Sequence, residues 1–337
     1  MMQLNQHHLP ESSMKGSGNT WAIVLAGGEG SRLHSLTRME SGIAVPKQYC
    51  SLRGGDSLLV EALERAASVA SAEHIVTVVS QGHRRWWEPA LSAMPHIGIA
   101  VQPRNCGTAN GILLPLLYIL ERDPAARVVL LPSDHHVRDE RVLAIALQDA
   151  ARELDTRPDD IILIGIQPEE ADPELGYILL GPADGAVCTV DQFIEKPSAA
   201  RARALVAAGA LWNSFMVAAR AQALLRPYLR QFPRIVGDMR RVVAKSGLAR
   251  DPSIAAVNLY KKLPSIDFSR QILQGAEPVL RVLRVPRCGW SDLGTPKRLA
   301  ETLRRLPPAE WTKSCSSQPA GLMSLAARYE LARHQAV

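Results

Sequence analysis

The segment Ala22-Ile-Val-Leu-Ala-Gly-Gly-Glu-Gly-Ser-Arg-Leu33 decides the fold of this chain. An apolar strand runs directly into a turn with glycines at positions 27, 28 and 30, and Arg32 follows the turn. Glycines allow a sharp turn and let backbone N–H groups approach phosphate oxygens without a Cβ atom in the way. The Arg32 guanidinium adds a planar positive group for an anionic ligand. The pattern therefore indicates a strand followed by a loop for the phosphates of a nucleotide.

Two common phosphate-binding loops with glycines of this kind do not fit. The kinase-type P-loop contains Gly-Lys followed by Ser or Thr, and no Gly-Lys pair occurs in the chain. The dinucleotide fingerprint Gly-x-Gly-x-x-Gly, read from Gly28, requires a glycine where the chain has Leu33. An NAD-dependent dehydrogenase is therefore disfavoured. On the loop alone, a strand–turn–helix connection without any ligand stays open.

The hydrophobic pattern from Trp21 onward predicts a doubly wound α/β fold with a mostly parallel central sheet flanked by helices. Short apolar runs alternate with amphipathic stretches, and the runs are continuous, as expected for strands covered on both faces. The expected strands are Trp21–Ala26, His74–Ser80, Ile97–Val101, Arg127–Leu131 and Ile161–Ile166. The expected helices between them are Leu58–Ala70, Gly111–Arg122 and Val142–Leu154.

After residue 166 the pattern changes, and a small inserted sheet on the substrate side is expected. Its strands are Gly176–Leu180 and Cys188–Glu195. A further strand at 278–285 leads into a helix that begins at Pro296 and ends at about Leu306. The other expected helices are Ala199–Ala208, Arg220–Gln231 and Ile235–Lys245.

The chain divides into three parts by composition. Residues 1–19 are polar and are predicted to be a disordered tail, whereas residues 20–306 are expected to form one folded domain. The double proline at 307 and 308 closes that domain. Residues 307–337 form a C-terminal tail, with a candidate amphipathic helix over 322–334.

Composition excludes several classes of protein. The net charge is +6, but basic residues are scattered among acidic ones without aromatic platforms, so nucleic-acid binding is not expected. The longest apolar stretch is interrupted by Pro115 and is too short to cross a membrane. The N-terminus lacks the apolar region of a signal peptide. The five cysteines show no Cys-x-x-Cys spacing, which favours a reducing, cytoplasmic location.

A second motif leads to a family resemblance. Leu25 to Leu33 resembles the Leu-x-Gly-Gly-x-Gly-x-Arg-Leu signature of the sugar-phosphate nucleotidyltransferases, also called sugar-nucleotide pyrophosphorylases. In that family a Pro-Lys-Gln-Tyr/Phe segment follows on the next loop, and here Pro46-Lys47-Gln48-Tyr49 occupies that place. Motifs in the family order cover about residues 21–300, and the pattern is most similar to the mannose-1-phosphate guanylyltransferases. The resemblance implies that residues 20–306 are a nucleotidyltransferase catalytic domain.

Two aspartates are candidate metal ligands. Asp134 follows the strand Val129-Leu-Leu-Pro132, and ligands of open α/β sheets bind beyond the carboxyl ends of the strands. A role as a loop or N-cap residue stays open for Asp134 on this evidence. The resemblance implies that Asp134 ligates Mg²⁺ within a Pro-Ser-Asp-His motif, and that Asp292 in Trp290-Ser-Asp-Leu-Gly294 is the other metal ligand. Magnesium takes few protein carboxylates and shares its other positions with water and phosphate oxygens.

The motifs between these aspartates imply a sugar-phosphate pocket. Leu175-Gly176-Tyr177 resembles the family turn in which glycine lets the backbone approach the sugar. Phe193-Ile-Glu195-Lys196-Pro197 resembles the Phe-x-Glu-Lys-Pro motif, where glutamate binds sugar hydroxyls and lysine holds the sugar phosphate. Trp212-Asn213-Ser214 resembles the segment whose asparagine contacts the sugar. Without the resemblance, Glu195 and Lys196 would be interpreted as a solvated surface pair.

The family likeness assigns the nucleotide to the glycine loop and two later segments. The implied catalytic groups are Arg32, Lys47 and Lys196, of which Arg32 and Lys47 contact the triphosphate. The implied nucleotide-binding residues are Leu25, Ala26, Gly27, Gly28, Gly30, Ser31, Arg32, Lys47, Asn105, Thr108 and Asp134.

Three positions depart from the guanylyltransferase pattern. Two residues are inserted around Cys106 in the Arg-Asn-Thr-Ala-Pro-Ala segment that contacts the base, and Asn110 replaces a proline. Phe215 stands where glycine is usual in the sugar segment, so its ring is expected either to narrow the pocket or to sit in the core. These departures leave the base and the sugar open.

The resemblance implies an enzyme that transfers a nucleotidyl group from a nucleoside triphosphate, by analogy GTP, to a sugar 1-phosphate, by analogy mannose 1-phosphate. The products are an NDP-sugar, here GDP-mannose, and pyrophosphate, and a homodimer is possible. One alternative is a nucleotidyltransferase for glucose or heptose 1-phosphate with another triphosphate. The other is a catalytically idle relative that binds a nucleotide sugar and regulates a partner.

Overall fold

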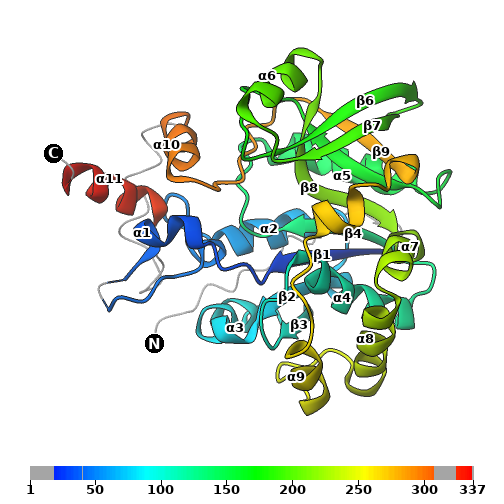
Figure 1. Cartoon of the computed structure of the whole chain (residues 1–337). Coiled ribbons are helices and arrows are strands. Elements are labelled where there is room, and N and C mark those ends of the chain that lie inside the picture. Colours follow the sequence, from blue (N-terminus) through cyan, green and yellow to red (C-terminus); the bar gives the residue numbers. More distant parts are fainter. Residues whose placement is uncertain (1–18, 40, 307–323, 336–337) are drawn as a thin grey trace.

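The computed structural model describes residues 19–39, 41–306 and 324–335 (Figure 1). Residues 1–18 of the expected N-terminal tail and most of the C-terminal tail lie outside the described residues. Strand β1 (Thr20–Ala26) occupies the centre of one half of the sheet, with β2 (Ile75–Ser80) and β4 (Arg127–Pro132) as its parallel neighbours. The glycine loop therefore leaves the sheet at a point flanked by strands on both sides.

A nine-stranded sheet forms the framework, in the order β3-β2-β1-β4-β8-β5-β9-β7-β6. Its first four strands are parallel, and β8 lies antiparallel to both of its neighbours, β4 and β5. The predicted doubly wound α/β class is confirmed, with helices on both faces of the sheet. The other strands are β3 (Gly98–Gln102), β5 (Ile161–Ile166), β6 (Gly176–Asp184), β7 (Val187–Glu195), β8 (Leu211–Arg220) and β9 (Leu280–Val285).

The expected inserted sheet is built by β6 and β7, which are continuous with the main sheet. Strand β7 pairs with β9, and β6 pairs with both β7 and β8. Because β8 also pairs with β5, and β5 with β9, these five strands close into a small barrel. The barrel holds Gly176 and Glu195, which are paired across β6 and β7.

Two hydrophobic cores cover the two faces of the sheet. Along β1 the side chains alternate, so that Ala22 and Val24 face one core while Trp21 and Ile23 face the other. The first core packs against α2 (Leu58–Ala67), α3 (Arg84–Ser92), α5 (Glu140–Glu153), α10 (Pro296–Arg304) and α11 (Leu325–Gln335). The second packs against α4 (Thr108–Arg122), α7 (Ala221–Gln231), α8 (Pro233–Ser246) and α9 (Ile254–Tyr260).

Helix ends follow ordinary capping chemistry. The side chain of Ser57 accepts a hydrogen bond from Val60 N at the start of α2, and Ser198 accepts one from Arg201 N at the start of α6 (Ala199–Ala207). The Thr295 side chain caps α10 in the same way. The short helix α1 (His34–Thr37) follows the glycine loop and lies beside α11 at one end of the molecule (Figure 1). Helix α11 is attached there through Leu325 N, which donates to Ser51 O.

The described elements that the sequence did not predict include β8, α3 and α9. Strand β8 was not expected, because Asn213 and Ser214 interrupt its apolar run. Helix α3 was missed because Pro89 lies inside it, and α9 was missed because it is short. The polar residues of β8 are stabilised by specific bonds, since Ser214 Oγ donates to Ile164 O at 2.6 Å.

Candidate active site

A cavity of about 310 Å³ opens beyond the carboxyl ends of β1 and β4. Its lining includes Leu25, at the end of β1, and Pro132, which ends β4, together with side chains from β6, β7 and β8. This is the edge at which ligands of open α/β sheets bind. The predicted site residues that line it are Leu25, Gly27, Gly28, Arg32, Asn105, Thr108, Asp134, Gly176, Glu195, Lys196, Asn213 and Asp292.

The glycine loop is held in shape by the Pro-Lys-Gln-Tyr segment. Gln48 is buried, and its Nε2 donates to Ala26 O at 2.9 Å and to Gly28 O at 2.8 Å. Gly30 has φ +62°, and a Cβ there would lie 3.1 Å from the Lys47 backbone nitrogen. A side chain at position 30 is thus disfavoured by both conformation and space. Gly30, Ala26 and Ser31 shape this loop rather than line the cavity.

Arg32 lies at the mouth of the cavity in an ion pair. Its Nη1 is 3.2 Å from Glu174 Oε2, and about half of each side chain is exposed. Both residues line the cavity. An exposed pair of this kind is weak, so the guanidinium can exchange its partner for an anionic ligand.

The loops that carry Asp134 and Asp292 are joined directly. His136 N donates to Ser291 O at 2.9 Å, and Ser291 N donates back to His136 O at 2.8 Å. Lys47, which is buried, adds a second connection, because its ammonium lies 3.1 Å from Asp134 Oδ2 and donates to Asp292 O at 2.5 Å. Two segments far apart in sequence are thereby locked together at the cavity.

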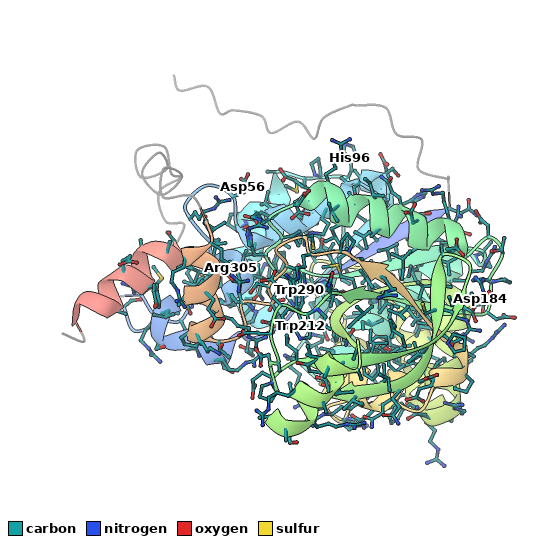
Figure 2. All side chains as sticks on the ribbon, turned by 90° about the horizontal axis from the view of Figure 1, so that it is seen from above. Asp56, His96, Asp184, Trp212, Trp290 and Arg305 are labelled. Carbon is teal, nitrogen blue, oxygen red and sulfur yellow. The ribbon has the colours of Figure 1, made fainter. Side chains whose placement is uncertain are left out.

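His135 and Trp290 form a third connection between the same loops. Trp290 Nε1 donates to His135 Nδ1 at 3.3 Å, and Trp212 lies 6.1 Å from Trp290 between ring centres, so the two indoles are neighbours (Figure 2). Burial lowers the pKa of His135 to about 4, so the ring is neutral at physiological pH. Because indole N–H only donates, the proton of His135 is on Nε2, 3.6 Å from Asp134 Oδ1.

The two carboxylates have different surroundings. Burial is the largest single effect on Asp134 and raises its pKa, but the charge of Lys47 and the hydrogen bonds to the carboxylate together lower the pKa below its ordinary value. Asp292 Oδ1 accepts from Gly294 N at 2.9 Å and lies 2.6 Å from Arg298 Nη1. Arg298 is buried in α10 and also pairs with Asp172 at 3.4 Å. Both contacts of the Asp292 carboxylate use Oδ1, which leaves Oδ2 for a cation.

This donor set suits Mg²⁺. Both ligands are hard oxygen donors that line the same cavity. Within the described part of the chain, no cluster of three or more His, Cys, Asp or Glu residues could hold a metal. A site of two carboxylates is nonetheless what Mg²⁺ requires when substrate phosphates and water supply the other ligands.

The sugar side of the cavity is a close cluster around Gly176. A Cβ on Gly176 would lie 2.6 Å from Glu195 Oε2 and 3.2 Å from Asn213 Cβ, so only glycine fits beside these side chains. Burial raises the pKa of Glu195, Lys196 lowers it, and Asp267 raises it further. Lys196 Nζ lies 3.8 Å from Glu195 Oε1 and is partly exposed to the cavity. The Glu195 carboxylate, the Asn213 amide and the Lys196 ammonium therefore lie close to one another.

Tyr177 differs from the sugar-contact role that the resemblance implied. Its side chain is fully buried, and its hydroxyl accepts from Trp212 Nε1 at 3.2 Å and donates to Asp172 O at 3.0 Å. It supports the turn before β6 from the core and is absent from the lining of the cavity.

The departures from the family pattern separate into two kinds. Cys106 is buried, and Asn110 Nδ2 donates to Cys106 O at 2.7 Å and to Pro264 O at 3.0 Å, so both stabilise the loop from behind. Asn105 and Thr108 of the same loop do line the cavity. Phe215 lines the cavity as well and also packs against the second core, so it takes part in both.

Backbone strain marks the same place independently of any motif. In the described residues, the non-glycine positions with positive φ are Lys196 at 50°, Phe215 at 63° and Leu293 at 46°. Two of them line the cavity, and Leu293 O accepts from Lys47 Nζ at 3.3 Å. Strained residues of this kind cluster at functional sites because the surrounding structure must hold them.

Sequence reasoning missed several residues of this site. Gln48 was quoted only as part of a motif, and its two bonds to the glycine loop could not be predicted. Glu174 gave no local signal, because its partner Arg32 lies more than 100 positions away in the sequence. Arg298 gave none either, because a loop separates it from its partner Asp292. A glutamate next to Leu175-Gly176-Tyr177 was the one available hint.

The structure is that of an α/β protein whose cavity lies beyond the carboxyl ends of its central strands. The chain matches the Nucleotidyl transferase family over residues 21–307, and it belongs to that family. No helix in the described ranges is long and apolar enough to span a membrane.

Named relatives are similar in sequence and in structure. The xanthan biosynthesis protein XanB of Xanthomonas campestris pv. campestris (strain B100) is 30% identical over 282 residues, covering 81% of this chain and 57% of that protein. The mannose-1-phosphate guanylyltransferase of Escherichia coli (strain K12) is 28% identical over 292 residues, covering 82% and 58%. The chain thus spans less than two thirds of the length of these relatives.

Solved structures share the fold. A Thermus thermophilus protein described as a mannose-1-phosphate geranyltransferase has a TM-score of 0.74 at 28% identity, covering 86% of this chain and 80% of that one. A UDP-glucose pyrophosphorylase complexed with UDP-glucose has a TM-score of 0.52 at 13% identity, covering 85% and 97%, which shows the fold alone. The chain thus shares its fold with these solved proteins.

Proposed function

We propose that this nucleotidyltransferase joins GTP and mannose 1-phosphate to give GDP-mannose and pyrophosphate. The choice of GTP and mannose rests on the relatives named as mannose-1-phosphate guanylyltransferases and on the motif pattern. Relatives named for xanthan and alginate biosynthesis make the supply of a polysaccharide precursor the natural setting.

The reaction needs no side-chain base. An oxygen of the sugar phosphate, already ionised, forms a bond to the α-phosphorus, and the bond from that phosphorus to the bridging oxygen of the β-phosphate breaks. The electron pair leaves with pyrophosphate. The protein must therefore align two polyanions and offset their repulsion, which is how phosphoryl-transfer enzymes generally work.

Each cavity-lining group has a part in that alignment. The backbone amides of Gly27 and Gly28 and the Arg32 guanidinium receive the triphosphate. Lys196 neutralises the sugar phosphate, and Glu195 and Asn213 bind sugar hydroxyls. Asp134 and Asp292 would hold Mg²⁺, which would offset the negative charge of the substrate phosphates when bound.

Lys47 acts one step behind the reacting groups. Its ammonium contacts the Asp134 carboxylate and the backbone carbonyl groups of Asp292 and Leu293, so it positions the Asp134 carboxylate and the loop that carries Asp292. The triphosphate contact implied for Lys47 by the resemblance would require one of these bonds to be exchanged. We therefore assign Lys47 a positioning role before any contact with phosphate.

The single observation that carries the proposal is the convergence of two acidic loops and the glycine loop on one cavity that also contains Glu195 and Lys196. An acidic pair alone would suit many metal enzymes, and a glycine loop alone would suit many nucleotide-binding proteins. The combination provides for two phosphate-bearing substrates at once.

A substrate matrix tests the proposal. Four nucleoside triphosphates are combined with mannose, glucose and heptose 1-phosphates, and pyrophosphate release is measured with Mg²⁺ present. GTP with mannose 1-phosphate is expected to give the highest kcat/KM. A different best pair replaces the assignment within the same reaction, whereas nucleotide-sugar binding without pyrophosphate release in any combination supports the idle regulator.

A further inference from the structure

A bulge in β8 places one side chain out of the regular sheet. Gly165 of β5 pairs with Asn213 of β8, and Leu163 pairs with Val217. Between these pairs β5 has only Ile164, whereas β8 has Ser214, Phe215 and Met216. Bulges of this kind re-aim side chains and are common beside active sites.

Phe215 is the residue that the bulge aims at the cavity. It has φ +63°, a left-handed conformation that is unfavourable for a residue with a Cβ atom and very unfavourable for an aromatic one. Phe215 lines the cavity and is half-buried. Glycine would adopt this backbone without strain, so the backbone alone does not explain the choice of phenylalanine.

The ring has a firm support behind it. Phe215 packs edge-on against Phe268 at 5.9 Å between ring centres, and Phe268 is fully buried and stacks on Tyr228. Phe268 N donates to Thr108 Oγ1 at 2.9 Å, which fixes that segment to the start of α4. A wall supported in this way cannot yield to a bulky ligand without disturbing the second core.

Phe215 is also bound to the sugar side of the cavity. Its backbone N–H donates to Asn213 Oδ1 at 3.1 Å. This bond occupies the carbonyl oxygen of the Asn213 side chain, so the amide presents its N–H groups to a ligand. A Cβ on Gly176 would meet Glu195 Oε2 and Asn213 Nδ2, at 2.6 Å and 3.5 Å. Phe215 is therefore bonded through its backbone to one of the two side chains that bind sugar hydroxyls in the proposed function.

We propose that Phe215 is a specificity-determining wall of the sugar subsite, which admits unsubstituted hexose 1-phosphates and excludes those that carry a 2-acetamido group. The inference rests on the proposed function, since it assigns Glu195, Asn213 and Lys196 to a sugar phosphate. In this proposal the sugar turns its 2-position towards residue 215, so an added acetamido group meets the Phe215 side chain. A benzyl side chain occupies more space than an acetamido group, and its removal opens room for it.

The test compares Phe215→Gly with Phe215→Leu and the wild type. Glycine keeps the backbone of the bulge, so a folded variant is expected, and leucine keeps most of the bulk. For each protein, kcat/KM is measured for the best hexose 1-phosphate and its 2-acetamido derivative by pyrophosphate release. The ratio of acetamido to unsubstituted substrate is expected to rise about tenfold or more in Phe215→Gly, and to change only a few-fold in Phe215→Leu.

Two further measurements separate the possible failures. Calorimetric binding of the same two sugar phosphates gives the selectivity even without turnover, so a protein that binds selectively but releases no pyrophosphate contradicts the proposed function alone. The preference between GTP and ATP is expected to stay constant, because the wall faces the sugar. The inference is overturned if Phe215→Gly leaves the ratio of acetamido to unsubstituted substrate unchanged. It is also overturned if the variant changes the preference between GTP and ATP instead of that ratio.

Discussion

Lys47 Nζ lies 3.1 Å from Asp134 Oδ2, and only 5% of the Lys47 side chain is exposed. The same ammonium donates to the backbone oxygens of Asp292 and Leu293. One lysine from the loop after β1 thus connects the two loops that carry the candidate metal ligands. The acceptors lie on two segments, one with Asp134 and one with Asp292 and Leu293, that are distant in sequence from Lys47 and from each other. These contacts therefore form only when the whole domain has folded.

Replacing this lysine by methionine is expected to destabilise the protein. Lys47→Met leaves the Asp134 carboxylate and two carbonyl groups without their donor, which is expected to lower the free energy of unfolding by about 2 kcal/mol. The loss is smaller than for a fully buried ion pair because Asp134 is partly exposed. Urea unfolding at neutral pH measures the change. The matched control is Lys297→Met, whose side chain is 73% exposed and pairs only with Glu301, and it is expected to change the free energy of unfolding by under about 0.5 kcal/mol. Equal effects in both variants would contradict the positioning role.

The two aspartates are expected to be needed for turnover. Asp134→Asn and Asp292→Asn should each lower kcat/KM on the order of 10²-fold or more, as for other preorganised groups that stabilise charge. Pyrophosphate release at varied Mg²⁺ concentration checks this, and a higher Mg²⁺ requirement is expected in both. Asp251→Asn serves as the control, because Asp251 is exposed and pairs with Arg84 outside the cavity. Normal Mg²⁺ dependence in both site variants would remove the metal assignment.

Substitutions of Arg32 and Glu174 are expected to change KM for the triphosphate in opposite directions. Glu174→Gln removes a negative charge 3.2 Å from the guanidinium that receives the triphosphate, so KM for the triphosphate is expected to fall a few-fold. Arg32→Ala is expected to raise the same KM. Thermal unfolding should change little in Glu174→Gln, because exposed pairs contribute about 0–1 kcal/mol. A rise in KM for Glu174→Gln would show that the glutamate assists nucleotide binding.

Much of this site follows from motifs because sheet topology brings them together. Asp134 comes directly after a buried parallel strand, and the glycine loop comes after its neighbour, so both had to meet at one edge of the sheet. The barrel that holds Glu195 was foreseen only as an inserted sheet. Its closure depends on β8, whose apolar run is interrupted by Asn213 and Ser214.

What could not be predicted depends on long-range contacts. Arg298 lies on an amphipathic helix, where an arginine is usually exposed, and only the folded chain shows it buried against Asp292 and Asp172. The orientation of Phe215 depends on a bulge that adds residues to one strand, which the alternation of side chains does not reveal. Tertiary packing therefore determines both the burial of Arg298 and the orientation of Phe215.

Glu195 predicts a pH-dependent stability with a definite sign. Burial raises its pKa above the ordinary 4.5 in the folded state, so the folded protein binds more protons than the unfolded chain just above that pH. The contribution of Glu195 to the free energy of unfolding therefore falls as pH rises through this interval. Glu195→Gln is expected to be more stable than the wild type at pH 7.5, with a gain that shrinks towards pH 4.5, and to have a higher KM for the sugar phosphate. Urea unfolding at both pH values measures it, and a variant that is less stable at pH 7.5 would contradict the buried-carboxylate explanation.

Because of the backbone conformation at Phe215, we expect the glycine variant to be more stable than the alanine variant, the reverse of the usual order. Phe215→Gly and Phe215→Ala both lose the ring, but alanine must still adopt φ +63°, which is unfavourable by about 1 kcal/mol for a residue with a Cβ atom. The glycine variant is therefore expected to unfold at higher urea concentration than the alanine variant. At Arg203, exposed on α6, the order should be the usual one, with Arg203→Ala more stable than Arg203→Gly by about 0.5–1 kcal/mol. If alanine were the more stable residue at both positions, the bulge would not impose a left-handed backbone at residue 215.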